Sequence, residues 1–197
     1  MALRNVDIDA FYVSPFTRTL QTANGILTAR GKTTKVFVEP GLSESLNATD
    51  YPPGYPSEQK RSDIIQWHDP NYLPIMSHLP RENGGDIGCY ERVAKTIEAI
   101  VNKSRGNICI VSHGSPIAAA HLHLYGRWDY VGQCTISRVL QSGKNFEAIV
   151  IGDCTHLSVK KDLHEVQSKN GESEKGKMLE RRVREERRKR NKSESSD

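Results

Sequence analysis

The sequence predicts an α/β fold with a mostly parallel β-sheet. One observation is a device that occurs twice, at residues 6–27 and 107–120, in which a short apolar run is followed by Ser and Pro and then by a helical pattern. A second is a further short apolar run at residues 34–39. Short apolar strands alternating with amphipathic helices are typical of parallel sheets. With 197 residues, the chain is long enough for one domain with a sizeable core.

The first device starts with residues 6–13 (VDIDAFYV), which we predict to be a strand. Ser14 is then expected to cap a helix, with Pro15 as its first residue. Gly31 is expected to end this helix. Its apolar residues recur at near-helical spacing, at Phe16, Leu20, Ala23 and Leu27.

The second device surrounds residues 108–111 (ICIV), which are predicted to form a strand buried on both faces. Ser115 and Pro116 are expected to be the N-cap and first residue of the next helix. His113 therefore falls in a strand-to-helix turn at the carboxyl end of a strand, where open α/β sheets bind ligands and helix N-termini favour anions. Two such units in one sheet would place Arg18 and His113 at the same edge.

The remaining elements follow from local patterns. They are a strand at 34–39, an amphipathic helix at 90–103, and two strands at 135–140 and 146–151 joined as a hairpin by 142–145. Residues 45–86 are predicted to be irregular, because they are rich in proline and glycine. Long loops in compact domains are often functional, and the tyrosines and tryptophan of this segment argue against full disorder.

The charge of the chain is unevenly distributed. Residues 177–192 carry nine Lys or Arg against three Glu, whereas residues 1–176 have no net charge. The isoelectric point near 8.9 is therefore a property of the tail. We expect a folded domain over residues 1–159 and a basic tail over residues 160–197 that is disordered or a solvated helix.

Composition excludes several classes of protein. No apolar run is long enough to span a membrane, and the first ten residues do not resemble a signal peptide. The four cysteines are far apart, so we expect reduced thiols in a cytoplasmic protein: Cys89, Cys109, Cys134 and Cys154. No set of residues has metal-ligand spacing, so neither a metal site nor a cofactor is expected.

Three motifs in order suggest a family. SPFTRTLQTA (residues 14–23), VEPGLSE (residues 38–44) and VSHGS (residues 111–115) together resemble the histidine phosphatase superfamily, also called phosphoglycerate-mutase-like. The likeness spans about residues 6–157 and is strongest to the branch of the suppressor-of-T-cell-receptor-signalling and ecdysteroid-phosphate phosphatases. The resemblance implies a three-layer α/β fold of the phosphoglycerate-mutase type.

The resemblance also implies roles for three residues. Arg18 matches the arginine that grips the phosphoryl group, for which a planar guanidinium is well suited. Glu44 matches the acid that protonates the leaving oxygen, and His113 matches the second histidine, which stabilises charge on the phosphoryl group. The expected catalytic residues are thus Glu44 and His113, and the expected phosphate-binding residues are Arg18 and His113.

The sequence departs from the family in one respect. The family's nucleophile is a histidine in an Arg-His-Gly motif at the end of its first strand, and these 197 residues contain no Arg-His-Gly. We therefore expect the family's first strand and helix to be absent, as in a truncated isoform or an incomplete gene model. Without that histidine no phosphohistidine can form, so we expect a phosphate-binding protein that is inactive in this form.

Two alternatives remain open. One is an active phosphomonoesterase, with a substitute nucleophile or as a longer chain, that acts on phosphotyrosine or small phosphate esters. The other is an interaction protein that binds a protein partner through its tail, where residues 187–192 (RRKRNK) are a candidate nuclear localisation signal. Nucleic acid is not expected as a partner, because glutamates interrupt the basic run and aromatic residues are lacking.

Overall fold

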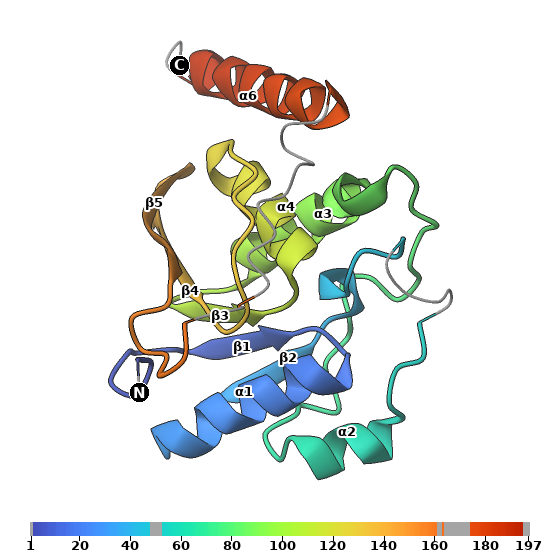
Figure 1. The fold of residues 1–197 in the computed structure, drawn as a ribbon, viewed down its shortest axis with the longest axis vertical. Helices are drawn as coiled ribbons and strands as arrows, with labels where there is room; N and C mark the ends of the chain where they lie inside the picture. Colours follow the sequence, from blue (N-terminus) through green and yellow to red (C-terminus); the bar gives the residue numbers. More distant parts are fainter. Residues whose placement is uncertain (1, 48–52, 161–162, 164–173, 195–197) are drawn as a thin grey trace. The chain divides into compact units, whose positions relative to one another are not determined.

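The computed structural model describes residues 2–47, 53–160, 163 and 174–194. The chain divides into two compact units, Met1–Pro116 and Ile117–Asp197, which are described separately below. Figure 1 shows the elements of both units in chain colours.

Met1–Pro116 is built on a parallel sheet. In chain order its elements are β1 (Ala10–Val13), α1 (Thr17–Arg30), β2 (Lys35–Val38), the 3-10 helix η1 (Pro40–Leu42), α2 (Glu58–Ile64), the 3-10 helix η2 (Gly85–Cys89), α3 (Tyr90–Lys103) and β3 (Ile108–Val111). The strand order is β2-β1-β3, with both pairings parallel. Val13 lies opposite Val38 on one side and Val111 on the other, so the three carboxyl ends meet at one edge. The predicted α/β class is confirmed.

Helices lie on both faces of this sheet. Phe11 and Val13 point to the face covered by α1 and form the core with its apolar stripe. The other buried members of this core are Leu20, Ala23, Leu27, Val36, Val38, Ile65 and Val111. Tyr12 points to the opposite face, where its hydroxyl lies 2.9 Å from Ser104 Oγ, directly after α3. Figure 1 shows α1 and α3 on opposite sides of β1.

The first device differs from its prediction at the start of the helix. The strand is shorter than residues 6–13, and α1 begins at Thr17 rather than at Pro15. Phe16 occupies the cap position, and its side chain has no atom that can accept a hydrogen bond. The hydroxyl of Ser14, the predicted cap, is bonded to a distant residue, as described below. The predicted stop is confirmed: Gly31 adopts φ +62°, and its N–H is donated to the carbonyls of Leu27 and Thr28.

The other elements of this unit lie close to their predicted ranges. α3 and β3 have the predicted bounds, and β2 is two residues shorter than expected. β3 is less buried than expected, since only Val111 is buried and its other three residues are half-buried. Residues 45–86 are not wholly irregular: they contain α2, capped by the Ser57 hydroxyl, and the start of η2.

The helix α4 (Gly114–Tyr125) leads into the second unit, Ile117–Asp197. It begins one residue before Ser115, the residue that the sequence predicts as its cap. β4 (Ile136–Ser142) and β5 (Asn145–Asp153) form the predicted antiparallel hairpin, with longer strands than expected. Ser142 pairs with Asn145, which leaves a two-residue turn in which Gly143 adopts φ +59°.

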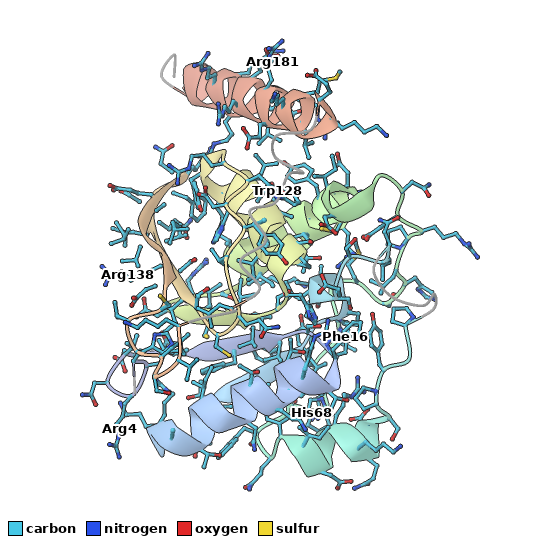
Figure 2. The ribbon with its side chains drawn as sticks, in the orientation of Figure 1. Arg4, Phe16, His68, Trp128, Arg138 and Arg181 are labelled. Carbon is cyan, nitrogen blue, oxygen red and sulfur yellow. The ribbon has the colours of Figure 1, made fainter. Side chains whose placement is uncertain are left out.

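The basic tail contains the helix α6 (Glu174–Glu194), which packs within the second unit. Val183 is only 2% exposed, although the sparse apolar residues of the tail predict no contribution to a core. Arg184 donates to the carbonyl of Gly126 and Arg187 to that of His123, both at 2.9 Å. These arginines therefore satisfy carbonyls at the C-terminal end of α4. In Figure 2, Arg181 lies on the side of α6 turned away from Trp128.

Within the described ranges, no helix is both long and apolar enough to cross a membrane. All four cysteines are free thiols, and burial raises the pKa of Cys109 to about 12.

Candidate functional site

The carboxyl edge of the sheet brings together Arg18, Glu44 and His113. Arg18 is the second residue of α1, which follows β1, and His113 follows β3 by two residues. Glu44 follows η1, which is separated from β2 by one residue, Glu39. Because the three strands are parallel and in register, the segments that follow them converge. The expectation that Arg18 and His113 share one sheet edge is confirmed.

Arg18 connects the three side chains. Its Nε lies 3.1 Å from Nδ1 of His113 and its Nη2 lies 2.8 Å from the same atom. Nη2 also lies 3.3 Å from Oε2 of Glu44. The side chain of Arg18 is 59% exposed, whereas those of Glu44 and His113 are 20% and 3% exposed. The guanidinium thus stands at the solvent-facing side of this Arg18–Glu44–His113 cluster.

The partners of His113 determine its tautomer. An arginine can only donate hydrogen bonds, so Nδ1 of His113 is an acceptor. The neutral ring therefore carries its proton on Nε2, which donates to Oγ of Ser14 at 2.8 Å. This direction is the reverse of the one that activates a serine, because the ring gives its proton to the hydroxyl and cannot take one from it.

His113 is neutral at physiological pH. Burial, followed by the positive charges of Arg18 and Arg92, lowers its pKa from 6.5 to about 3. Its Nδ1 lies 3.6 Å from Oε2 of Glu44, but because the ring is uncharged this approach is not an ion pair. The positive charge bonded to the Glu44 carboxylate is that of Arg18.

Glu44 has the properties of a proton donor. Burial raises its pKa above the ordinary value, and the repulsion from Asp86 acts in the same direction. Three groups oppose this effect by stabilising the carboxylate. They are the backbone N–H of Ser45, which donates to it, and the positive charges of Arg18 and Arg92. A carboxyl group with a raised pKa beside an anion-binding arginine is suited to give a proton to a leaving oxygen.

Two aromatic rings border the cluster. The ring of Phe16, labelled in Figure 2 just before α1, meets the ring of His113 edge-on at 4.9 Å between centroids. Arg18 Cζ lies 4.8 Å from the Phe16 centroid, and Tyr55 meets Phe16 at 5.5 Å. Tyr55 is therefore an aromatic residue of the 45–86 segment that lies beside the cluster. Residues 48–52, including Tyr51, lie outside the described residues.

A buried ion pair behind the cluster was not predicted from the sequence. Arg92 Nε lies 2.6 Å from Oε1 of Glu82, and their side chains are 0% and 2% exposed. Arg92 also donates to the carbonyls of Gly41, Ser43 and Glu44. One signal was present, since Arg92 stands beside Val93 at the start of an amphipathic helix whose apolar stripe is buried.

The other histidines of Met1–Pro116 are placed elsewhere. His68 forms a bridge with Val36 at the outer edge of β2, and His78 contacts Ser77. Neither has a contact with Arg18 or Glu44 in the described structure. No group of three or more His, Cys, Asp or Glu side chains among the described residues is arranged to hold a metal ion.

A comparison with protein families matches residues 1–153 to the model of the histidine phosphatase superfamily (branch 1). This match covers most of the chain. The chain belongs to branch 1 of the histidine phosphatase superfamily. The resemblance carried by the three sequence motifs is thereby confirmed.

A solved structure shares the fold of this superfamily member. It is the ecdysone phosphate phosphatase, EPPase, from Bombix mori in complex with tungstate, with a TM-score of 0.57 and 21% sequence identity. The match covers 81% of this chain and 69% of the EPPase chain. At this identity the likeness shows the fold alone. No curated protein matches the chain.

Proposed function

We propose that this superfamily member binds phosphate or a phosphoester at the Arg18–Glu44–His113 cluster and does not hydrolyse it in this form. The observation that carries the proposal is the convergence of the three side chains on one sheet edge. Arg18 would bind two phosphoryl oxygens, since its guanidinium is the exposed member of the cluster. The EPPase structure is a complex with tungstate, an oxyanion, which supports a ligand of this class.

The absence of turnover is inferred from the residues available for attack. The superfamily resemblance implies a phosphohistidine formed on an Arg-His-Gly histidine, and residues 1–197 contain no such motif. His113 does not replace that nucleophile, because its Nδ1 is occupied by Arg18 and its Nε2 carries the proton. Glu44 and Arg18 alone would leave only weak residual catalysis.

Binding is tested by calorimetric titration with inorganic phosphate and with vanadate. We expect saturable binding by the wild-type chain and a loss of at least about tenfold in affinity for Arg18→Ala, because one charge-assisted contact contributes about 1.5–3 kcal/mol. Arg105→Ala is a matched control, since Arg105 is exposed and donates to the carbonyls of its neighbours Asn102 and Ser104. Equal affinities for the wild type and Arg18→Ala would refute the proposed site.

Turnover is tested separately with a generic aryl phosphate. We expect hydrolysis by the wild-type chain to be no faster than that by His113→Ala. The alternative of an active phosphomonoesterase predicts an acid-labile phosphoenzyme after acid quenching with a radioactive phosphodonor. Such an intermediate on these 197 residues, or robust hydrolysis that His113→Ala abolishes, would overturn the proposal of inactivity.

A further inference from the structure

We propose that the buried Arg92–Glu82 pair positions Glu44, holding the segment of residues 41–46 so that the Glu44 carboxyl group stays at the cluster. This inference rests on the proposed function, because Glu44 is one of the three residues of the proposed site. Neither residue belongs to the three motifs that led to the family. Both act through the main chain of another segment, so they are positioning residues rather than catalytic ones.

Arg92 binds three carbonyl groups of the same short segment. Its Nη1 donates to the carbonyl oxygens of Gly41 at 2.8 Å and Ser43 at 2.9 Å. Its Nη2 donates to the carbonyl oxygen of Glu44 at 3.0 Å. A planar guanidinium has its donors in a fixed fork, so these bonds set the path of the backbone as well as its distance from α3.

Glu82 holds the same segment at Leu46, two residues after Glu44. One of its carboxylate oxygens accepts the 2.6 Å bond from Arg92 Nε, and the other accepts the N–H of Leu46 at 2.8 Å. The pair therefore brackets Glu44, with Arg92 bound to the carbonyl of Glu44 itself and Glu82 bound two residues later. Because both side chains are withdrawn from water, these bonds are not exchanged for bonds to solvent.

The surroundings of the Glu44 carboxyl group connect the pair to the site. The charged groups that face Glu44 come from three elements: Arg18 of α1, Asp86 of η2 and Arg92 of α3. The carboxyl group is held among them at 20% exposure, and this burial is the main cause of its raised pKa. If the 41–46 segment loosens, the carboxyl group gains water, and its pKa falls toward the ordinary value.

The test measures the pKa of Glu44 by carboxyl-carbon NMR in the ligand-free protein. Arg92→Lys keeps the positive charge but cannot reach three carbonyls, so we expect the pKa of Glu44 to fall toward that of an exposed glutamate. Glu82→Gln is the milder second variant, because an amide oxygen still accepts from Leu46 N–H while the ion pair is lost. We expect a smaller fall in the pKa of Glu44 for Glu82→Gln. This variant also tests the positioning role if Arg92→Lys does not fold.

Arg30 offers a matched control. It is a second buried arginine, 6% exposed, and its Nη1 donates to the carbonyls of Leu3 and Val6, which lie outside the 41–46 segment. Arg30→Lys should lower stability while leaving the pKa of Glu44 unchanged. An unchanged Glu44 pKa in both folded variants, Arg92→Lys and Glu82→Gln, would overturn the positioning role, as would an equal fall in Arg30→Lys.

A sulfate arm separates this inference from the proposed function. Sulfate stays a dianion throughout the titration, so it raises the pKa of a carboxyl group that it approaches. We expect saturating sulfate to raise the Glu44 pKa in the wild type and to raise it by less than half as much in Arg92→Lys. If sulfate has no effect on the wild type, the proposed binding site fails, while the ligand-free comparison still decides whether Arg92 positions Glu44.

Discussion

At the scale of single residues, both ring nitrogens of His113 form hydrogen bonds to side chains from another part of the chain. Ser14 accepts from Nε2 and Arg18 donates to Nδ1. These contacts determine one tautomer and keep the ring neutral. The arginine expected to hold phosphate is thus also bound to the histidine, and an anion has to compete with His113 for it.

The depressed pKa of His113 predicts a pH-dependent loss of stability. In the unfolded chain the ring binds a proton below about pH 6.5, whereas in the folded chain it stays neutral down to about pH 3. The unfolded state therefore binds more protons in this window, and the contribution of His113 to the free energy of unfolding falls by about 1.4 kcal/mol per pH unit as the pH decreases. Urea unfolding of His113→Gln should show a shallower decline than the wild type across this window.

The comparison of the two proteins isolates His113. His68 and His121 also have lowered pKa values, mainly through burial, but they contribute equally to both proteins. The raised pKa of Glu44 acts in the opposite direction. Because the folded state binds this proton more tightly than the unfolded state, protonation of Glu44 stabilises the fold as the pH falls. Parallel pH profiles for the wild type and His113→Gln would contradict the neutral state assigned to the buried ring.

Ser14 and Ser45 form a second residue-scale comparison. Both are fully buried, but Ser14 accepts from His113, whereas Ser45 Oγ has no hydrogen-bond partner in the described structure. Ser14→Ala should cost about 1–3 kcal/mol, because it leaves a buried N–H without an acceptor. Ser45→Ala should be neutral or slightly stabilising. Thermal unfolding of both variants measures the difference, and equal losses would contradict the assigned bond.

At the scale of elements, the 3-10 helix η1 is held from both ends. Glu39 is fully buried and accepts the N–H of Gly41, and it also accepts from the hydroxyl of Tyr72 and the N–H groups of Ile75 and Met76. Arg92 and Glu82 hold the other end, as described above. These bonds at both ends fix the backbone of η1, which connects β2 to the segment that carries Glu44.

Gly41 tests this tight packing. A Cβ at Gly41 would clash with Oγ1 of Thr96 and lie 2.9 Å from Oε1 of Glu39, so the Gly41→Ala variant should lose about 1–3 kcal/mol. Gly25 in α1 is the control, because nothing lies within 4 Å of a Cβ there. Gly25→Ala should gain about 0.5–1 kcal/mol from helix propensity. Chemical denaturation of the two variants should therefore give shifts of opposite sign.

α6 provides the second element-scale prediction. Val183 is 2% exposed and Met178 on the same helix is 68% exposed. Val183→Asp should weaken the packing of α6 by at least the lost burial of the side chain, about 1.5–3 kcal/mol, so that the helix unfolds more often and is cleaved faster by trypsin. Met178→Asp should leave the cleavage rate unchanged. Equal trypsin sensitivity of the two variants would show that Val183 does not anchor the helix.

At the scale of the whole molecule, the proposed binding groups all belong to the unit Met1–Pro116. Their convergence depends on three parallel strands that end together and on α3, which supplies Arg92 from the other face of the sheet. A ligand at this site therefore stabilises every element of that unit that must be in place for the site to form.

Phosphate should stabilise this unit by mass action. At a hundredfold excess over its Kd, inorganic phosphate should add about 2.7 kcal/mol to the free energy of unfolding. In a Trp128→Phe background the remaining tryptophan, Trp67, packs against the core of Met1–Pro116 and reports its unfolding by fluorescence. Arg18→Ala should abolish the phosphate effect. A phosphate-induced shift that persists in Arg18→Ala would assign it to another site or to salt.

The sequence by itself determined the elements whose signals are local. The helix at Tyr90–Lys103, the strand at Ile108–Val111 and the helix end at Gly31 lie where periodicity and glycine conformation predict them. The order of the three motifs also predicted the family, and the repeated strand, Ser-Pro, helix pattern predicted that Arg18 and His113 share one edge of the sheet. These features depend on residues close together in the chain, or on the rule that parallel strands end at a common edge.

The tertiary structure decided what each polar group near the site binds. The Ser14 hydroxyl bonds to His113 instead of capping α1, because the partner 99 residues away is buried beside it. Arg92 binds carbonyls about fifty residues earlier in the chain, and Val183 of the basic tail is buried within its own unit. These partners depend on which polar groups the fold buries next to one another. A local sequence pattern does not contain that information, because the partners are far apart in the chain.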